Sequence, residues 1–210
     1  MRRALAAGVL VSLIGCATAP GPMIVVPPPT SWEGEVAAER VSRDDLFRHA
    51  ADSPLPEGRR AGFGGLTYYP ADPSWRYGGM VEAYPHPERL TIVTTNGASR
   101  PCERFGRVRF ARDGKILTLH VYRLLDQPGR PGGEGLFLPF KDTTSGNETY
   151  AAGRYVDLVG PDGGPFTLDF NRAYNPSCAY GDAQRFQCPA TPAENALPIA
   201  VTAGERGPAR

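Results

Sequence analysis

The hydrophobic pattern divides the chain near residue 54. Before it, the stretch Ser31–Ala50 predicts a helix, because Ser31 can cap its start and acidic residues in the first turn suit the helix dipole. One side of this helix is expected to be buried, and it carries Val36, Arg40, Leu46 and Phe47. Ser42 can cap a second segment, so a break is expected there. Pro54 and Pro56 end the helical region.

Beyond residue 60 the apolar positions follow the twofold alternation of β-strands. Strands are expected at residues 66–69, 80–84, 90–95, 107–111, 116–124, 135–140, 154–159 and 166–170, with a last one at 197–203. Turn residues separate them, and Asp113-Gly114 is the clearest hairpin signal, with Leu117, Leu119 and Val121 on one face of the following strand. Because no helical crossovers intervene, the pattern predicts a mainly β fold. We expect an antiparallel sandwich or barrel-like sheet with an N-terminal helical segment.

The N-terminus has the three parts of an export signal. Two arginines follow Met1, an apolar run of 11 residues extends from Ala4 to Ile14, and Gly15 precedes Cys16. The run is too short to span a bilayer as a helix, so it predicts a cleavable signal peptide at residues 1–15. Residues 13–16 resemble the lipobox of bacterial lipoproteins, which predicts lipidation of Cys16. The alternative is an ordinary secretory signal with an incidental cysteine.

A lipidated Cys16 would attach the chain to a membrane of the cell envelope through its lipid anchor. Ala17 stands where an aspartate would retain a lipoprotein at the inner membrane, so the outer membrane, facing the periplasm, is expected if the cell has one. Residues 16–30 are rich in proline and predict a semi-rigid tether. Within it, Met23–Val26 form a short apolar patch that could dock on the domain or on lipid. Residues 31–206 are expected to form a single β-rich domain.

Composition bears on partners and cofactors. Removing Arg2 and Arg3 leaves 21 basic against 22 acidic residues, and no basic run stands out, so nucleic acid binding has no electrostatic support. The sequence contains neither a P-loop nor a G-x-G-x-x-G motif, and no cofactor is expected. It also lacks a G-x-S-x-G motif, which argues against a serine hydrolase.

Three cysteines remain after Cys16. Cys178 and Cys188 are close in sequence and flanked by turn residues, and export would permit a disulfide, so these two are predicted to pair. Metal ligation by the pair is the alternative. No C-x-x-C or H-x-x-x-H spacing supports it, and no metal is expected. Cys102 is then left over and is interpreted as a small buried hydrophobe.

Two polar motifs are the most distinctive part of the sequence. The first is FKDTTSGNETYAAGRY from Phe140 to Tyr155, and the second is DFNRAYNPSCAY from Asp169 to Tyr180. They are similar to the signatures F-x-D-x-T-x-G-x-E-T-Y-x-x-G-R-Y and D-F-N-x-A-Y-N-P-x-C-A-Y of a prokaryotic domain-of-unknown-function family. The resemblance extends over residues 41–205. It departs at Asp45, at Thr191, where proline is usual, and in a longer loop between Cys178 and Cys188. It implies a family and no reaction.

The motifs hold side chains that could carry chemistry. Asp142, Glu148 and Asp169 are candidate acid and base groups of a hydrolase, and Arg154 could bind a carboxylate or phosphate in bidentate fashion. In the competing interpretation Asp142, Thr144 and Thr149 staple a long loop, and Arg154 pairs with a carboxylate inside it. The remaining candidates for ligand contact are Tyr150, Asn171, Tyr174, Asn175 and Asn195.

Three functions remain open from the sequence. The first is a small-ligand-binding or accessory module of the cell envelope, with a small polar or anionic ligand held between residues 140–155 and 171–195. The second is a hydrolase that uses acidic residues of the two motifs, and the third is a purely structural envelope protein. An open pocket lined by the charged candidates would favour the first two. Burial with mutual satisfaction would weaken the hydrolase.

Overall fold

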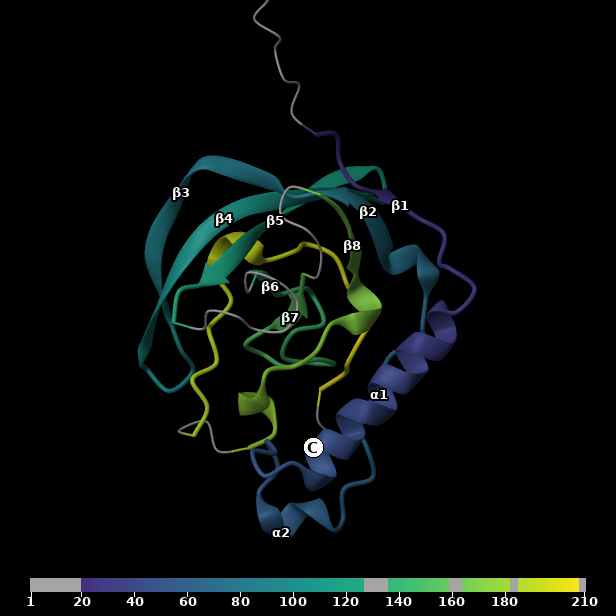
Figure 1. Cartoon of the computed structure of the whole chain (residues 1–210), viewed down its shortest axis with the longest axis vertical. Coiled ribbons are helices and arrows are strands. Elements are labelled where there is room, and N and C mark those ends of the chain that lie inside the picture. The colour runs from purple at the N-terminus through teal and green to yellow at the C-terminus, as the bar shows by residue number, and fades with distance from the viewer. Residues whose placement is uncertain (1–19, 127–135, 159–163, 182–184, 208–210) are drawn as a thin grey trace, which may run out of the picture.

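Two antiparallel sheets in a sandwich-like arrangement form the body of the protein (Figure 1). The computed structural model describes residues 20–126, 136–158, 164–181 and 185–207. The smaller sheet has the order β1-β2-β8, with β1 (Ile24–Val25), β2 (Arg76–Met80) and β8 (Pro165–Asp169). The larger has the order β3-β4-β5-β6-β7, with β3 (Glu82–Val93), β4 (Ser99–Arg112), β5 (Lys115–Leu124), β6 (Leu136–Phe140) and β7 (Arg154–Asp157). The mainly β fold predicted from the alternation is confirmed.

The N-terminal helical segment is one continuous helix, α1 (Trp32–His49), which lies along one side of the sheets (Figure 1). Ser42 lies inside it, so the expected break was wrong. A serine weakens a helix interior only slightly, and the neighbouring Arg43 is held by tertiary contacts. Leu46 was expected to be buried but is 58% exposed. The shorter helical elements are α2 (Glu57–Arg60), η1 (Pro73–Trp75), η2 (Phe170–Arg172), η3 (Ser177–Ala179) and η4 (Ala193–Asn195).

The β4–β5 hairpin follows its sequence signal closely. Asp113 and Gly114 both have positive φ, at 50° and 72°, which matches the twist of a tight hairpin turn. The pairing of Arg112 with Lys115 sets the register of the two strands. That register turns Leu117, Leu119 and Val121 into the core, as the alternation predicts.

The strands before this hairpin are longer than the sequence pattern predicts. β3 extends over residues 82–93, although Pro85 and Pro87 lie within it. Its pairing with β4 shifts register between Ala83 and Glu88, so both prolines fall in an irregular stretch where no ladder bond is required of them. Proline and charged residues therefore hid the middle of a strand, whose two ends the pattern predicted separately at residues 80–84 and 90–95.

Two predicted strands are absent. Residues 66–69 contribute only an isolated bridge between Tyr68 and Glu205, so that prediction was wrong. Residues 197–203 are irregular, because the backbone N–H and carbonyl of Val201 form hydrogen bonds with side chains and not with a neighbouring strand. Its N–H donates to Asp142, and its carbonyl accepts from Arg154.

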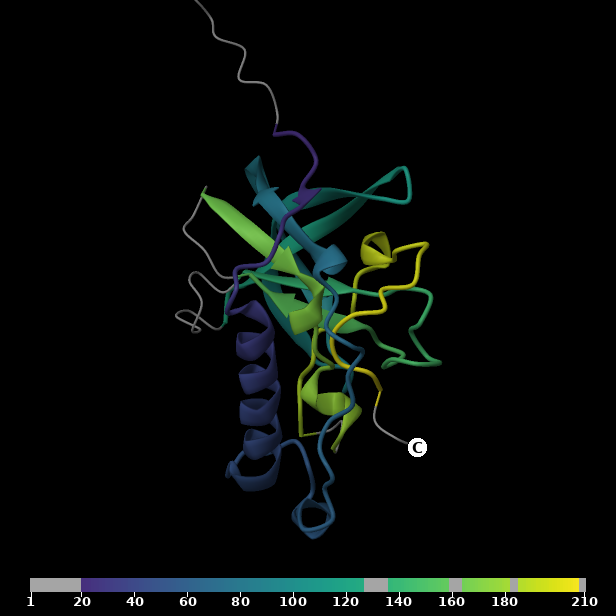
Figure 2. The same ribbon diagram turned by 90° about the vertical axis from the view of Figure 1, so that its right-hand side faces the viewer.

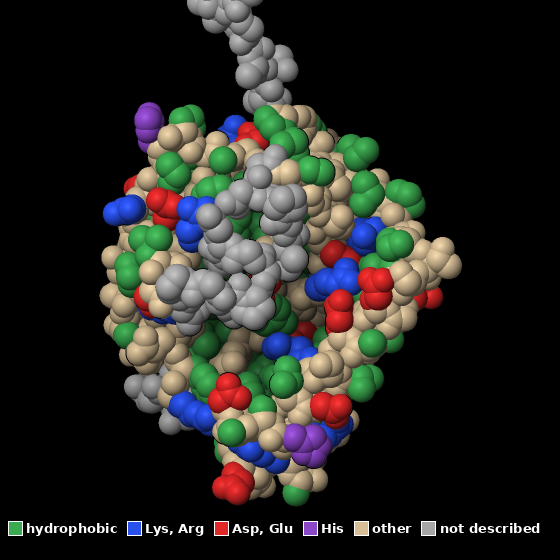
Figure 3. Space-filling view, in the orientation of Figure 1, with side chains coloured by type: hydrophobic (Ala, Val, Ile, Leu, Met, Phe, Trp, Pro, Cys, Tyr) green, Lys and Arg blue, Asp and Glu red, His purple; other side chains and the backbone are tan. Residues whose placement is uncertain are grey.

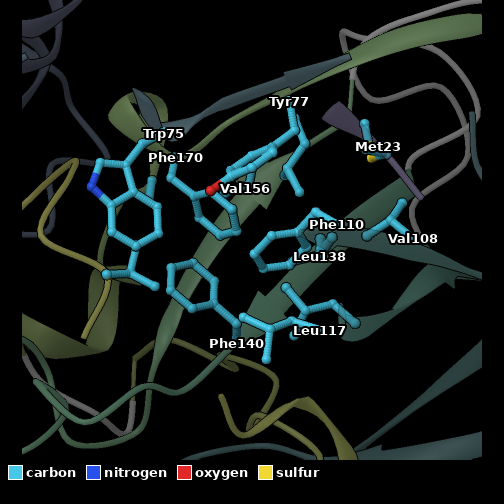
Figure 4. Packing of buried hydrophobic residues seen from close by; sticks show 14 of the residues in the cluster. Met23, Trp75, Tyr77, Val108, Phe110, Leu117, Leu138, Phe140, Val156 and Phe170 are labelled. Atoms are coloured by element: carbon cyan, nitrogen blue, oxygen red, sulfur yellow. The ribbon is translucent and has the colours of Figure 1, made fainter. Parts of the chain in front are cut away.

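An aromatic cluster fills the space between the sheets (Figure 4). The ring of Phe170 lies at its centre and contacts four other rings, with centroid distances of 5.2–6.1 Å to Trp75, Tyr77, Phe110 and Phe140. Such tilted and edge-on contacts stabilise a core beyond the area that they bury. This core comes from both sheets and fixes their relative position.

The proline-rich segment is docked on the domain where the structure describes it. Residues 20–26, which we call the N-terminal strap, join the two sheets. The N–H of Met23 donates to the carbonyl of Arg109 in β4, and Ile24 and Val25 then pair with β2. Met23 is 1% exposed and belongs to the core.

The predicted signal peptide, Cys16 and the first residues of the predicted tether lie outside the described residues. Among the helices of the described ranges, none is both long and apolar enough to cross a membrane.

Candidate functional site

Arg154, at the start of β7, lies in the interior of the fold. Its Nη2 donates to Asp142 Oδ2 at 2.9 Å and to the carbonyl of Val201 at 2.8 Å. Its Nη1 donates to the carbonyls of Ala203 and Glu205, at 2.6 and 3.2 Å. The arginine is 1% exposed. Burial lowers the pKa of its guanidinium, and the neighbouring Asp142 carboxylate opposes that effect. We call Arg154, Asp142 and the three carbonyls the arginine clamp.

The loop after β6 is stapled through Asp142, in the manner of the structural interpretation. Oδ1 of Asp142 accepts from the N–H and the hydroxyl of Thr144, at 3.1 and 2.6 Å. The hydroxyl of Thr144 also lies 2.9 Å from that of Thr149, and both threonines are buried. Glu148 is more open, with its side chain 43% exposed and bonded to the Tyr69 hydroxyl at 3.0 Å.

Asp169, at the end of β8, joins the start of α1 to the smaller sheet. It is 3% exposed, and its Oδ2 accepts from Trp32 Nε1 at 2.7 Å. The same oxygen accepts from Arg76 and Arg172, at 3.2 and 2.8 Å. Its Oδ1 accepts from the backbone and side chain of Asn171. Both oxygens of this carboxylate are therefore occupied within the fold.

Asn175 and Glu205 form a second buried polar cluster. The Asn175 amide donates to Glu205 Oε1 at 3.1 Å, and the Tyr180 hydroxyl donates to the same oxygen. Arg43 Nε pairs with Glu205 Oε2 at 3.0 Å. Burial raises the pKa of the Glu205 carboxyl, and Arg43 acts in the opposite direction.

The remaining sequence candidates are spread over the molecule. Asn195 bonds both backbone groups of His120 and so fixes η4 to β5. The Tyr174 hydroxyl donates to Asp157 at 2.9 Å, and Tyr150 is half-buried. The ten candidates thus do not gather around one pocket. Only Asn171, Tyr174 and Asn175 line the hollow described next.

A hollow of about 510 Å³ lies between α1 and the segment after β8, and we call it the α1 pocket. Figure 3 shows the face of the molecule that is hollowed beside α1. Its walls carry three arginines and two acidic residues together with aromatic and amide side chains. The lining residues are Val36, Glu39, Arg40, Arg43, Tyr68, Asp157, Asn171, Arg172, Ala173, Tyr174, Asn175 and Ser177.

Arg40 differs from the other two arginines of the α1 pocket. Its guanidinium carbon lies 4.5 Å from the centre of the Tyr68 ring. Its Nε and Nη2 are buried without a hydrogen-bond partner, and so is the Tyr68 hydroxyl. Burial lowers the pKa of Arg40 and raises that of Tyr68. Within the described ranges, no carboxylate forms an ion pair with Arg40.

The other two pocket arginines are paired. Arg43 binds Glu205 and the carbonyl of Asn175, at 3.0 and 3.1 Å. Arg172 binds Glu39 and Asp169, at 2.9 and 2.8 Å. Arg40 is therefore the one arginine of the pocket that forms no ion pair within the described residues, although the Asp169 carboxylate favours its charged form from a longer distance.

The sequence reasoning did not single out Arg40 or Arg43 as site residues. A signal existed, because Arg40 stands on the side of α1 that was expected to be buried. A guanidinium is rarely buried unless it has a partner. An arginine on an apolar helix face can therefore mark a site as well as an ion pair.

The predicted disulfide is confirmed. Cys178 and Cys188 are bonded, with their Cα atoms 6.3 Å apart. Cys102 is free and buried, and burial raises the pKa of its thiol to about 11. Among the residues with described positions, no group of His, Cys, Asp and Glu side chains is arranged to hold a metal ion.

Comparison with known proteins shows a family but no activity. Residues 61–206 match a family model described as protein of unknown function (DUF1684). The solution NMR structure of an uncharacterized protein from Haloarcula marismortui is also similar. Its sequence is 37% identical, the match covers 84% of this chain and 94% of that one, and the TM-score is 0.64. No curated protein matches the chain. The matched residues 61–206 include the arginine clamp, whereas Arg40 and Arg43 lie before them.

Proposed function

The chain belongs to the DUF1684 family of proteins of unknown function, and from that premise we propose a role based on its site. The protein is a lipid-anchored component of the cell envelope that binds a small anionic ligand in the α1 pocket. Its anchor is the lipid on Cys16, which holds the domain at the outer membrane, facing the periplasm, where the cell has one. The ligand provides the negative charge that Arg40 lacks.

The guanidinium of Arg40 carries this proposal, because two of its nitrogens are buried without a hydrogen-bond partner and it forms no ion pair within the described residues. A charged group that is withdrawn from water and left without a partner destabilises the fold, so a bound anion that restores the pairing gains free energy. The guanidinium carbon of Arg40 also lies 4.5 Å from the centre of the Tyr68 ring, a contact that restricts the direction of its donors before a ligand arrives.

The acidic residues of the α1 pocket do not cancel this charge. Glu39 is paired with Arg172, and Asp157 keeps its charge while it accepts from the neutral Tyr174 hydroxyl, but neither carboxylate forms an ion pair with Arg40 in the described part of the chain. The volume of about 510 Å³ lies in the range of small-molecule pockets. A small organic acid or inorganic phosphate would fit this combination of size and charge.

Calorimetric titration with citrate, succinate and inorganic phosphate tests the site. At least one of these anions should bind the wild type, and Arg40→Met should weaken that binding about tenfold or more, since a hydrogen bond to a charged group contributes about 1.5–3 kcal/mol. Arg89→Met is the matched control, because it removes the same charge from an exposed position on β3. Equal binding by the two variants, or no binding to the wild type, contradicts the proposal.

The anchor needs a separate test. Cys16→Ser should abolish incorporation of labelled palmitate and release the protein from the membrane fraction, because the thiol is the site of acylation. Ala17→Ser changes a neighbouring residue to the same side chain and should leave both readouts intact. Membrane association that survives in Cys16→Ser would contradict lipid anchoring.

The hydrolase alternative has less support. Two of its three candidate carboxylates, Asp142 and Asp169, are buried, and both oxygens of each accept hydrogen bonds within the fold. Only Glu148 is partly open, and it lies outside the α1 pocket. A paired general acid and base facing one substrate is therefore not formed by these three groups.

A further inference from the structure

A row of apolar residues crosses the outer surface where the N-terminal strap joins the sheets. The parallel bridge between Met23 and Phe110 places Ile24 beside Ala111. Ala111 is paired with Ile116 on its other side. Met23 and Phe110 are buried, so their neighbours along each strand point outward.

The row continues onto the smaller sheet. Ile24 pairs with Gly78, and Met80 lies two residues further along β2 on the same face. At Gly78 a Cβ atom would lie 2.6 Å from a methyl carbon of Val26, so the glycine leaves room for another apolar side chain. We call Ile24, Met80, Ala111 and Ile116 the strap face.

The strap face is open to solvent. Ile24 is 66% exposed, Ile116 54% and Met80 39%. Val25, next to Ile24 in β1, is also 49% exposed, whereas Val41 and Leu46 lie on α1 and Val93 lies at the end of β3. Contiguous exposed apolar positions mark interaction surfaces more often than single ones do.

The described chain begins beside the strap face. The carbonyl of Pro20 accepts from Arg109 Nη2 at 2.6 Å, and Arg109 is two residues from Ala111 on the outer side of β4. Figure 2 shows the N-terminal segment, in purple, passing over this end of the sheets. Cys16 is four residues before Pro20, so the two are at most about 14 Å apart even in an extended chain.

We propose that the strap face lies against the bilayer that holds the lipid of Cys16, an inference that rests on the lipid anchor of the proposed function. The strap face contacts the interfacial region of that membrane, because the short segment between Cys16 and Pro20 keeps it within reach of the headgroups.

The charges around the strap face suit a membrane surface. Glu82, the acidic residue beside Arg109, is paired with both Arg107 and Arg109. Lys115 is exposed next to Ile116, where it can meet an anionic headgroup, and the exposed Asp113 of the same turn lies 3.9 Å from Arg112. A few apolar side chains flanked by such cations favour shallow insertion in the interface.

This orientation leaves the ligand site accessible. Figure 1 shows the N-terminal segment leaving at one end of the molecule and α2 lying at the other. The α1 pocket lies along α1, between these ends, so a membrane on the strap face leaves its opening in the aqueous phase.

Environment-sensitive fluorophores on single introduced cysteines test the inference in the full lipidated protein. Ile24→Cys and Ile116→Cys report on the strap face, and Val41→Cys and Val93→Cys are matched controls at equally exposed apolar positions. In phosphatidylglycerol-containing vesicles the two strap-face probes should shift to shorter wavelength and be quenched several-fold more by brominated lipids than the controls. Near-ultraviolet circular dichroism confirms that each variant is folded.

The outcomes separate the anchor from the orientation. If palmitate labelling is present but all four probes are quenched equally, or none is, the strap face does not meet the bilayer and the inference fails while the anchor stands. If labelling is absent, the anchor of the proposed function fails, and the inference fails with it. Selective quenching at Ile24 and Ile116 supports both.

Discussion

Arg154 and Arg40 show how the same type of side chain has different roles in two regions of this molecule. In the arginine clamp, Arg154 meets a carboxylate and three backbone carbonyls, all from the same fold. In the α1 pocket, Arg40 rests on an aromatic ring with two buried nitrogens that have no partner. The difference teaches that burial alone does not distinguish a structural arginine from a binding one. Arg154 Nε is also buried without a hydrogen-bond partner, so what separates the two is the paired carboxylate, which Arg154 has in Asp142 and Arg40 lacks among the described residues.

The two regions also differ in how the family model treats them. The clamp lies inside residues 61–206, whereas Arg40 and Arg43 lie in α1, before the matched residues. The part of the chain that matches the family model therefore includes β2 to β8 and the wall of the α1 pocket formed by residues 171–177. The helix that completes the pocket is part of this chain's fold outside that match.

The largest effect is expected from the clamp. Removing one partner of a buried ion pair leaves the other charge uncompensated, so Arg154→Ala should cost about 3–5 kcal/mol of unfolding free energy. Arg154→Lys cannot reproduce the planar fork, and should cost about 1–3 kcal/mol and lower the melting temperature by several degrees. Differential scanning calorimetry measures both.

The exposed Arg89 provides the control for these variants, and Arg89→Ala should change the unfolding free energy by less than about 0.5 kcal/mol. An Arg154→Lys protein as stable as the wild type would mean that the clamp does not hold the fold, and the contrast with Arg40 would disappear.

Glu205 connects the two regions, since its carbonyl accepts from Arg154 while its side chain binds Arg43 at the α1 pocket. Burial raises the pKa of this carboxyl, so the folded state holds its proton more tightly than the unfolded chain does. The resulting contribution to stability is present below the unfolded pKa and is lost as pH rises through the folded one. Glu205→Gln lacks this titration and should gain stability relative to the wild type as pH rises.

Denaturant unfolding of both proteins between about pH 4 and pH 8 measures this drift. Asp126→Gln is a suitable reference, because Arg100 holds the pKa of the Asp126 carboxyl low. The stability difference from the wild type should therefore change with pH in the opposite direction. If Glu205→Gln instead loses stability relative to the wild type as pH rises, the effect of Arg43 on the pKa of Glu205 outweighs the effect of burial.

The smallest effect on stability is expected at Arg40. Arg40→Met loses a contact with the Tyr68 ring, worth about 0.5–1 kcal/mol, but also removes the cost of an uncompensated buried charge. We expect a net change within about 0.5 kcal/mol in the absence of ligand, in a thermal melt run beside Arg154→Lys. A loss above about 2 kcal/mol would place Arg40 with Arg154 as a structural residue.

Local patterns predicted much of the fold. The Asp113-Gly114 turn and the alternation after it placed β4 and β5, because a hairpin's register depends on its own few residues. The pairing of Cys178 with Cys188 was equally local. By contrast, residues 197–203 have a strand-like composition but bond to Arg154 and Asp142, partners that only the tertiary structure brings near.

The candidate site was predicted less well for the same reason. The sequence motifs drew attention to Asp142, Arg154 and Asp169, whose dense hydrogen bonding the structure places inside the fold. Arg40 carries no motif, and its lack of a partner is a property of the packed molecule. Only its position on the apolar side of a helix could have indicated it beforehand.

The clamp also has a consequence for the order of events in synthesis. The carbonyls that receive Arg154 belong to residues 47, 49 and 51 positions later in the chain. A ribosome must therefore add residues through Glu205 before all of these carbonyls can enclose the guanidinium. For the exported protein that we propose, this order would leave the clamp unformed during most of translation, which suits passage through a translocation channel.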